Sequence, residues 1–343
     1  FRERIKINGE MISEQSVIEF VQNYKAGFEE VKPSFFEMTV ALAFDHFSKS
    51  KVDIAIIETG LGGRLDSTNV VTPELSVITN IGYDHQQFLG DTLPEIAGEK
   101  AGIIKPNVPV VVGEFQQEVA EIFESKARDT HSRLRFANRE WGARKQILED
   151  DKLQMKLRHY DGMELEVESE LSGPHQAKNL ITVLEVVRTL SETDWNITQE
   201  HFKAGITHVI SNTGLKGRWQ VLGRNPLIIA DTGHNREGLG PNIKRLLSDR
   251  NPEQLHFVWG MVNDKDVSKP LAMLPKEASY YFCKPDVPRG LGVQYLSETA
   301  KELGLKHIPF PSVLEALEAA KSLAKRDDII YVGGSTFVVA EVV

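Results

Sequence analysis

The chain has 343 residues, 41% of them hydrophobic and 26% charged, which is enough for about two domains with sizeable cores. Its formal net charge of −9 argues against nucleic acid or an anionic membrane as the main partner. No apolar run reaches the roughly 18 residues of a membrane span, no secretory signal opens the chain, and the single cysteine, Cys283, excludes an intrachain disulfide. We therefore expect a cytoplasmic protein.

Short apolar runs alternate with amphipathic stretches, which is typical of α/β proteins with largely parallel sheets. Three early runs predict strands buried on both faces, over 52–57, 75–81 and 108–112. Helices are expected over 35–47 and 93–103, the second capped by Asp91 and Thr92. Polar residues gather just beyond these strands, at the edge where open α/β sheets bind ligands.

The pattern then changes twice. Short alternating segments between 133 and 170 predict a small antiparallel sheet, and helices return near 179–190 and 198–204. Turn formers over 211–218 predict an interdomain linker. Beyond it, the expected elements are a helix over 314–324 and strands over 227–230, 255–259, 280–283 and 329–332. We therefore predict one domain over 1–214 and a smaller, doubly wound domain over 215–343.

Three residues of the first domain are candidates for metal chemistry. Glu58 ends the first predicted strand beside a glycine-rich turn, where a carboxylate can hold Mg²⁺ against phosphates; a solvated strand end is the alternative. His85 follows the second strand, and a hydrogen-bonded structural histidine is its alternative. Lys100 lies on the next helix. A lysine amine at a metal site can react with CO₂ to give a carbamate, although an ordinary solvated lysine is the default.

The second domain offers residues for phosphate and carboxylate binding. The strand 227–230 leads into Asp231 and His234, which are placed to bind a ribose or a phosphate. Arg218, in the predicted linker, can reach a phosphate or can be an exposed charge. Ser335 follows the last strand, where backbone N–H groups and a hydroxyl can receive a carboxylate, or where the chain simply turns into a helix.

The order and context of these motifs closely resemble the folylpolyglutamate synthase family, often bifunctional with dihydrofolate synthase, within the Mur ligase superfamily. The stretch 58–69 is the most diagnostic, since it separates this branch from the cell-wall ligases. The matching stretches span the chain: 1–11, 33–37, 58–71, 78–106, 173–179, 217–218, 231–235 and 333–335. The resemblance implies a P-loop NTPase-like central domain followed by a Rossmann-like α/β domain.

The resemblance also implies roles for individual residues. Glu58 and His85 become Mg²⁺ ligands, and Lys100 becomes a carbamylated lysine near the metal. The residues assigned to ATP are Asn179, Arg218, Asp231 and His234, of which Arg218 and His234 lie nearest the phosphates and Asp231 nearest the ribose or adenine. Arg4 is implied near the substrates, and Ser335 in the amino-acid pocket.

The implied activity is an ATP-dependent ligase that adds L-glutamate to folate through an acyl phosphate, and the resemblance leaves open whether dihydropteroate is a second acceptor. A monomer that binds small molecules is expected. Family members begin with a P-loop, yet no G-x-x-x-x-G-K-[ST] occurs here. We therefore expect an N-terminally truncated chain, inactive as it stands.

Two alternatives remain open at this point. The first is another amino-acid ligase of the Mur superfamily, acting on a peptidoglycan precursor or on cyanophycin. The second is a non-catalytic nucleotide-binding protein without a P-loop. The combination of Glu58, His85 and Lys100 speaks against this second alternative.

Overall fold

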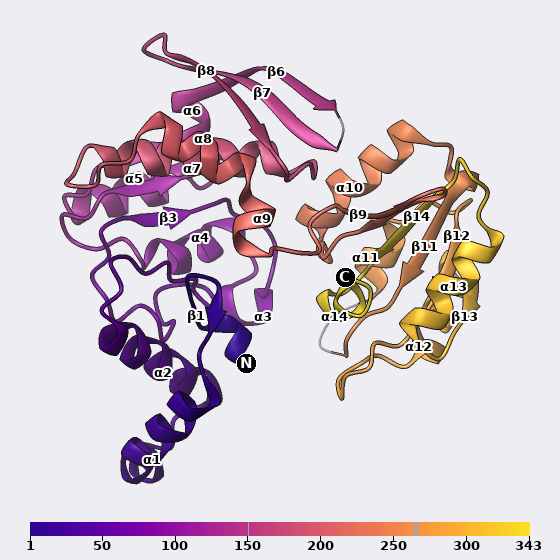
Figure 1. Cartoon of the computed structure of the whole chain (residues 1–343), viewed down its shortest axis with the longest axis horizontal. Coiled ribbons are helices and arrows are strands. Elements are labelled where there is room, and N and C mark those ends of the chain that lie inside the picture. The colour runs from indigo at the N-terminus through magenta and orange to yellow at the C-terminus, as the bar shows by residue number, and fades with distance from the viewer. Residues whose placement is uncertain (150, 264–266) are drawn as a thin grey trace. The chain divides into compact units, whose positions relative to one another are not determined.

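The computed structural model describes residues 1–149, 151–263 and 267–343 (Figure 1). The chain forms two compact units, Phe1–Glu140 with Leu184–Ile197 and Trp141–Val183 with Thr198–Val343. Within the described ranges, neither unit has a helix that is long and apolar enough to cross a membrane.

The first unit begins with a hairpin and two helices. These elements are η1 (Arg2–Arg4), β1 (Lys6–Ile7), β2 (Glu10–Met11), α1 (Glu14–Val31) and α2 (Phe35–Ser50). Ser34 caps α2 by accepting a hydrogen bond from the Glu37 backbone N–H, and the Glu37 carboxylate accepts one from the Ser34 backbone N–H in return. The helix predicted over 35–47 is therefore confirmed.

A three-stranded parallel sheet forms the centre of this unit. The remaining elements are β3 (Ser76–Ile78), α3 (Gln86–Leu89), α4 (Leu93–Ala101), β4 (Val110–Val112), α5 (Ala120–Asp129), β5 (Leu134–Phe136) and α6 (Ala137–Glu140), with the strand order β3-β4-β5. All three residues of β4 are fully buried, as expected for a middle strand covered on both faces. Thr92 and Glu95 form a capping box on α4, which confirms the predicted start of that helix.

The strand predicted over 52–57 is not formed. Ile54 is 51% exposed and Ile56 is 91% exposed. A strand needs a hydrogen-bonded neighbouring strand as well as β-branched side chains, because backbone N–H and C=O groups without such a neighbour form hydrogen bonds with water instead. In the described part of the chain, β3 pairs with β4 on one side, and no strand pairs with 52–57 or with the other side of β3.

The predicted antiparallel sheet is present in the second unit, but it begins later than expected. It contains β6 (Trp141–Glu149), β7 (Lys152–His159) and β8 (Glu164–Ser169). Residues 134–136 instead form β5, at the edge of the parallel sheet, so their assignment to the antiparallel sheet was wrong. The alternation was misleading because the middle residue, Arg135, is buried beside Glu185 rather than facing water.

Three helices follow the antiparallel sheet. They are α7 (Gln176–Ser191), whose last half belongs to the first unit, α8 (Gln199–Thr207) and α9 (Val209–Thr213). The start of the predicted linker is therefore helical. Gly214, with φ +66°, ends α9 in the left-handed conformation that glycine adopts without strain.

The rest of the second unit is a six-stranded sheet with helices on both faces. Its elements are β9 (Gln220–Arg224), β10 (Leu227–Ala230), α10 (Arg236–Asp249), η2 (Pro252–Gln254), β11 (Leu255–Trp259), α11 (Ser268–Ala272), β12 (Ser279–Phe282), α12 (Val293–Leu303), β13 (Lys306–Pro309), α13 (Val313–Leu323), β14 (Ile329–Gly333) and α14 (Thr336–Ala340). The strand order is β13-β12-β11-β14-β10-β9, with only β9 antiparallel among the described strands. This arrangement confirms the predicted α/β architecture, while β9 and β13 were not predicted.

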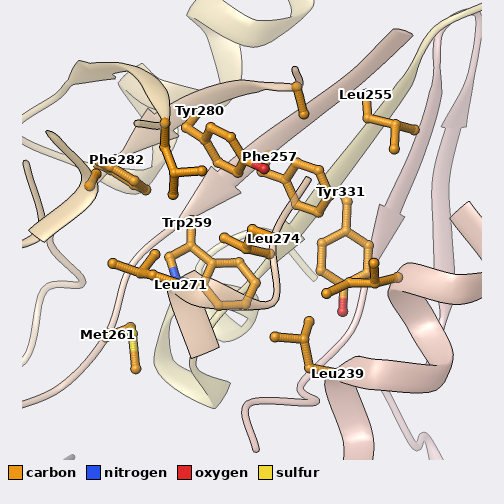
Figure 2. Packing of buried hydrophobic residues seen from close by; sticks show 14 of the residues in the cluster. Leu239, Leu255, Phe257, Trp259, Met261, Leu271, Leu274, Tyr280, Phe282 and Tyr331 are labelled. Carbon is orange, nitrogen blue, oxygen red and sulfur yellow. The ribbon is translucent and has the colours of Figure 1, made fainter. Parts of the chain in front are cut away.

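Alternate residues of the strands fill two separate cores. In β14, Ile329 and Tyr331 face the core under α10, α11 and α12, whereas Ile330 and Val332 face the core under α13 and α14. Figure 2 shows the first core, in which the rings of Phe257, Trp259, Tyr280, Phe282 and Tyr331 gather with leucines of the helices. Burying both faces makes the sheet a rigid support for the loops at the carboxyl ends of its strands.

Candidate functional site

Glu58 is exposed and stands at the start of a loop, residues 58–69, that Asp66 organises. One carboxylate oxygen of Asp66 accepts hydrogen bonds from the backbone N–H groups of Gly60 and Leu61, each at 2.9 Å. The other accepts from the backbone N–H of Thr68 at 2.9 Å and from its hydroxyl at 2.5 Å. Burial alone would raise the pKa of Asp66, but these hydrogen bonds outweigh it and lower the pKa. Asp66 was not among the sequence candidates.

The loop 58–69 packs directly against the C-terminal end of α4. The backbone N–H of Arg64 donates to the Glu99 carbonyl at 2.8 Å, and its guanidinium donates to the Glu99 carboxylate at 2.8 Å. Asn69 donates from its side-chain amide to the Gly102 carbonyl at 3.1 Å. A Cβ at Gly63 would approach the carbonyl oxygens of Glu99 and Lys100 within 3.0 and 3.2 Å. The diagnostic loop is therefore fixed to the helix that carries Lys100.

His85 and Lys100 both lie near Asp84. His85 precedes α3 with φ +52°, its side chain is exposed, and its backbone N–H donates to the Asp84 carboxylate at 2.9 Å. Lys100 is half-buried. Burial lowers the pKa of its amine, and the negative charge of Asp84 opposes that change. A lowered pKa increases the neutral fraction of the amine, which is the form that reacts with CO₂.

Gln116 holds the segment that leads to His85. Its side-chain oxygen accepts from the backbone N–H of Ile81 at 2.8 Å, and its side-chain nitrogen donates to the Ile81 carbonyl at 2.8 Å. A glutamine after a strand gives no distinctive sequence signal, so this residue too was missed. Its pair of bonds fixes the chain four residues before His85.

The side chains around His85 include oxygen ligands of the kind that Mg²⁺ prefers, but they do not form a complete metal site by themselves. Mg²⁺ prefers oxygen ligands and is usually held by one or two carboxylates together with water and substrate phosphates. Glu58 is an exposed carboxylate at the start of the loop 58–69, and Asp84 is a second carboxylate, next to His85. Among the described residues no group of three or more His, Cys, Asp or Glu side chains is placed to hold a metal ion. The metal-binding roles of Glu58 and His85 therefore stay predictions.

In the second unit, Arg218, Asp231 and His234 meet around Thr232, at the carboxyl end of β10. The exposed guanidinium of Arg218 donates to the Thr232 hydroxyl at 2.8 Å, and Nδ1 of His234 lies 3.0 Å from the Thr232 carbonyl oxygen. Asn235 caps α10 by accepting from the backbone N–H of Gly238 at 2.9 Å. The N-terminus of this 14-residue helix therefore lies beside a cation and an imidazole, an arrangement that suits a phosphate.

Asp231 is fully buried, unlike Arg218. Its carboxylate accepts from the backbone N–H groups of Trp219 and Gly233, at 2.7 and 2.8 Å, and from the side-chain amide of Asn242 at 2.7 Å. In this conformation its carboxylate links the loop that contains Trp219 to the loop that contains Gly233. Its contact with a ribose or adenine stays a prediction.

Asn179 lies on the first turn of α7 and is exposed. Its side-chain nitrogen donates to Gln176 at 3.0 Å, and Gln176 in turn contacts His175 at 3.0 Å. Burial lowers the pKa of His175, Arg218 lowers it further, and Asp231 opposes both. His175 therefore lies within electrostatic range of the loops around Thr232.

The two proposed substrate residues differ in their surroundings. Ser335 is buried, follows β14 and caps α14 by accepting from the Phe337 backbone N–H at 3.2 Å. Because β10 and β14 are parallel neighbours, Ser335 lies at the same sheet edge as Asp231. Arg4 has a 67% exposed side chain, 4.0 Å from the Glu3 carboxylate, and nothing in the described chain joins it to the other candidates.

Comparison with known proteins gives matches along the whole chain. Residues 10–187 match the Mur ligase middle domain, and residues 217–336 match the glutamate ligase domain of Mur ligases. The folylpolyglutamate synthase of Lacticaseibacillus casei is 31% identical over 305 residues, which cover 85% of this chain and 69% of that protein.

A second relative is longer. The probable bifunctional folylpolyglutamate synthase/dihydropteroate synthase of Haloferax volcanii is 29% identical over 357 residues, which cover 99% of this chain but only 41% of that protein. Among solved structures, Escherichia coli FolC in complex with DHPP and ADP matches with a TM-score of 0.84 and 27% identity, covering 100% of this chain and 78% of that one.

Proposed function

Because the chain belongs to the Mur ligase family, we propose that it is the main part of an ATP-dependent ligase that adds L-glutamate to folate or dihydropteroate. The observation that carries the proposal is the whole-chain likeness to a FolC structure that holds ADP and DHPP. Two sequence relatives are named folylpolyglutamate synthase and dihydrofolate synthase/folylpolyglutamate synthase, which supports the same activity.

The reaction must first activate a carboxylate, since a carboxylate oxygen is a poor leaving group. Transfer of the γ-phosphoryl group of ATP to the carboxylate of the pterin acceptor gives an acyl phosphate and releases ADP. The neutral amine of glutamate then attacks the carbonyl carbon and gives up a proton, and the tetrahedral oxyanion collapses to an amide with release of phosphate. The proposal assigns Ser335, at the sheet edge near Asp231, to the carboxylate of the incoming glutamate.

The residues of this chain bind and orient the reactants. Arg218, His234 and the N-terminus of α10 would hold the phosphates, while Asn179 would contact the nucleotide. Glu58 and His85 would hold Mg²⁺ beside Lys100, which would be present as its carbamate. When bound, the metal supplies positive charge that neutralises the transferred phosphoryl group. Arg4 would contact the folate side.

The test uses the protein expressed from its full coding sequence. We expect ADP release that requires both a pterin acceptor and glutamate, and a product that mass spectrometry shows to carry one further glutamate residue. A panel containing dihydropteroate, folate and a peptidoglycan precursor identifies the acceptor. Glutamate transfer to the cell-wall precursor alone would replace the proposed acceptor, and ADP release that ignores glutamate would refute the ligase.

A further inference from the structure

Asn242 is a polar residue in the core beneath α10. It is fully buried, although its neighbours Leu239, Ile243 and Leu246 belong to the apolar cluster shown in Figure 2. Its side-chain nitrogen donates to Asp231 at 2.7 Å and to the Tyr331 hydroxyl at 3.0 Å. The nitrogen must face Asp231, because a carboxylate only accepts hydrogen bonds.

The side-chain oxygen of Asn242 is buried without a hydrogen-bond partner in the described part of the chain. A buried unsatisfied oxygen is unfavourable, and an apolar side chain of similar size would avoid it. The side-chain oxygen of Asn242 therefore lowers the stability of the fold. The side-chain nitrogen of the same amide provides a hydrogen-bond donor to Asp231.

Asp231, which Asn242 holds in place, also forms hydrogen bonds with two loops. Its other hydrogen bonds come from the backbone N–H groups of Trp219, next to Arg218, and Gly233, next to His234. Trp219 has φ +52°, a conformation that a bulky residue adopts only when its surroundings enforce it. The loops are also tied together directly, since the Thr232 backbone N–H donates to the Gly217 carbonyl at 2.9 Å.

We infer that Asn242 is a positioning residue of the nucleotide site, which acts through Asp231 to fix the loops that present Arg218 and His234 to phosphates. Asn242 itself touches no substrate. The inference rests on the proposed function for the identity of the ligand, whereas the hydrogen-bonded clamp itself is independent of it.

Asn242→Leu tests the clamp, because leucine removes both the donor and the unsatisfied oxygen. Its matched control is Tyr281→Phe, which removes a buried hydrogen bond, between Tyr281 and His256, from another part of the same sheet. Both variants are made in the protein expressed from its full coding sequence. Calorimetry then compares their affinities for ADP and for inorganic tripolyphosphate, which has no ribose.

We expect Asn242→Leu to weaken both ligands by about tenfold or more and to a similar extent, as for the loss of a hydrogen bond to a charged group. Tyr281→Phe should leave both affinities within about twofold of the original. Tyr331→Phe removes only the hydrogen bond from Asn242 to Tyr331 and keeps the one to Asp231. Its affinities for both ligands should therefore lie between those of Asn242→Leu and Tyr281→Phe. Loss of ADP binding with unchanged tripolyphosphate binding would overturn the inference, since it would mean that only a ribose contact is affected.

Hydrogen exchange in the nucleotide-free protein separates the clamp from the proposed function. Asn242→Leu should speed exchange of the Trp219 and Gly233 amides, and Tyr281→Phe should not. Unchanged exchange at those amides overturns the clamp whether or not the protein ligates glutamate. Faster exchange in a protein that binds neither ADP nor tripolyphosphate would support the clamp and refute the nucleotide site.

Discussion

Replacing Gly102 with alanine tests the contact between the loop 58–69 and α4. Gly102 has φ −63°, an ordinary helical value, so alanine suits the backbone. A Cβ there would lie 2.3 Å from Cβ of Arg64 and 2.5 Å from its Cα. Carbon atoms normally approach to about 3.5 Å, so the loop must move by about 1 Å, and overpacking of this kind costs about 1–3 kcal/mol.

Gly98→Ala is the matched control on the same helix. A Cβ at Gly98 meets nothing within 4 Å, so alanine should stabilise the helix by about 0.5–1 kcal/mol. Urea unfolding of both variants, followed by circular dichroism, measures the two changes in the free energy of unfolding. Opposite signs are expected. If Gly102→Ala were as stabilising as Gly98→Ala, the loop would not lie against the helix.

Three further predictions concern charged residues. Glu58→Gln and His85→Ala should each lower turnover about 100-fold or more in the protein from the full coding sequence, and near-normal rates would remove them from the metal site. In CO₂-free buffer Lys100→Met should raise the free energy of unfolding near neutral pH, because burial lowers the pKa of Lys100 in the folded state. Between that lowered pKa and 10.5 the unfolded state binds more protons than the folded state, so the stability of the original protein rises with pH. The gain from Lys100→Met should therefore shrink over this window. A gain that is constant from about pH 7 to about pH 10 would contradict this. Arg135→Met should cost about 3 kcal/mol in urea unfolding, because it removes the buried guanidinium that donates to the Glu185 carboxylate at 2.9 Å and to the Glu192 carboxylate at 2.7 Å. Arg128→Met, at an exposed ion pair, is the control and should change little.

Much of the fold could be predicted from the sequence because its signals are local. The buried run 227–230 became β10 with the predicted bounds, and Thr92 caps α4 as its side chain predicts. The strand predicted over 52–57 was wrong because a strand needs another strand to pair with, and the hydrophobicity of a segment does not show whether one is present. The assignment of residues 134–136 to the antiparallel sheet was wrong because an ion pair allows the charged Arg135 to be buried in the parallel sheet.

The candidate site was predictable where residues follow strands. Arg218, Asp231 and His234 lie together because the end of β10 pairs with the start of the antiparallel strand β9, which Arg218 precedes. The position of Asp231 and His234 after a strand, and of Arg218 in a turn-rich segment, was sufficient to nominate them. The residues that hold the candidates in place could not be nominated. Asp66 accepts hydrogen bonds from backbone N–H groups of the loop that begins at Glu58, and the buried Asn242 donates to Asp231; such contacts appear only when the chain is folded.

A crystal structure of the protein expressed from its full coding sequence, with Mn²⁺ and AMPPCP, would show whether Glu58 and His85 hold a metal ion, because the anomalous signal of manganese locates the ion independently of the surrounding atoms. We expect an ion bonded to Glu58 and His85 and to the phosphates of the nucleotide, with electron density that extends beyond Nζ of Lys100. An ion coordinated elsewhere, with Glu58 and His85 pointing away from it, would remove both residues from the metal site.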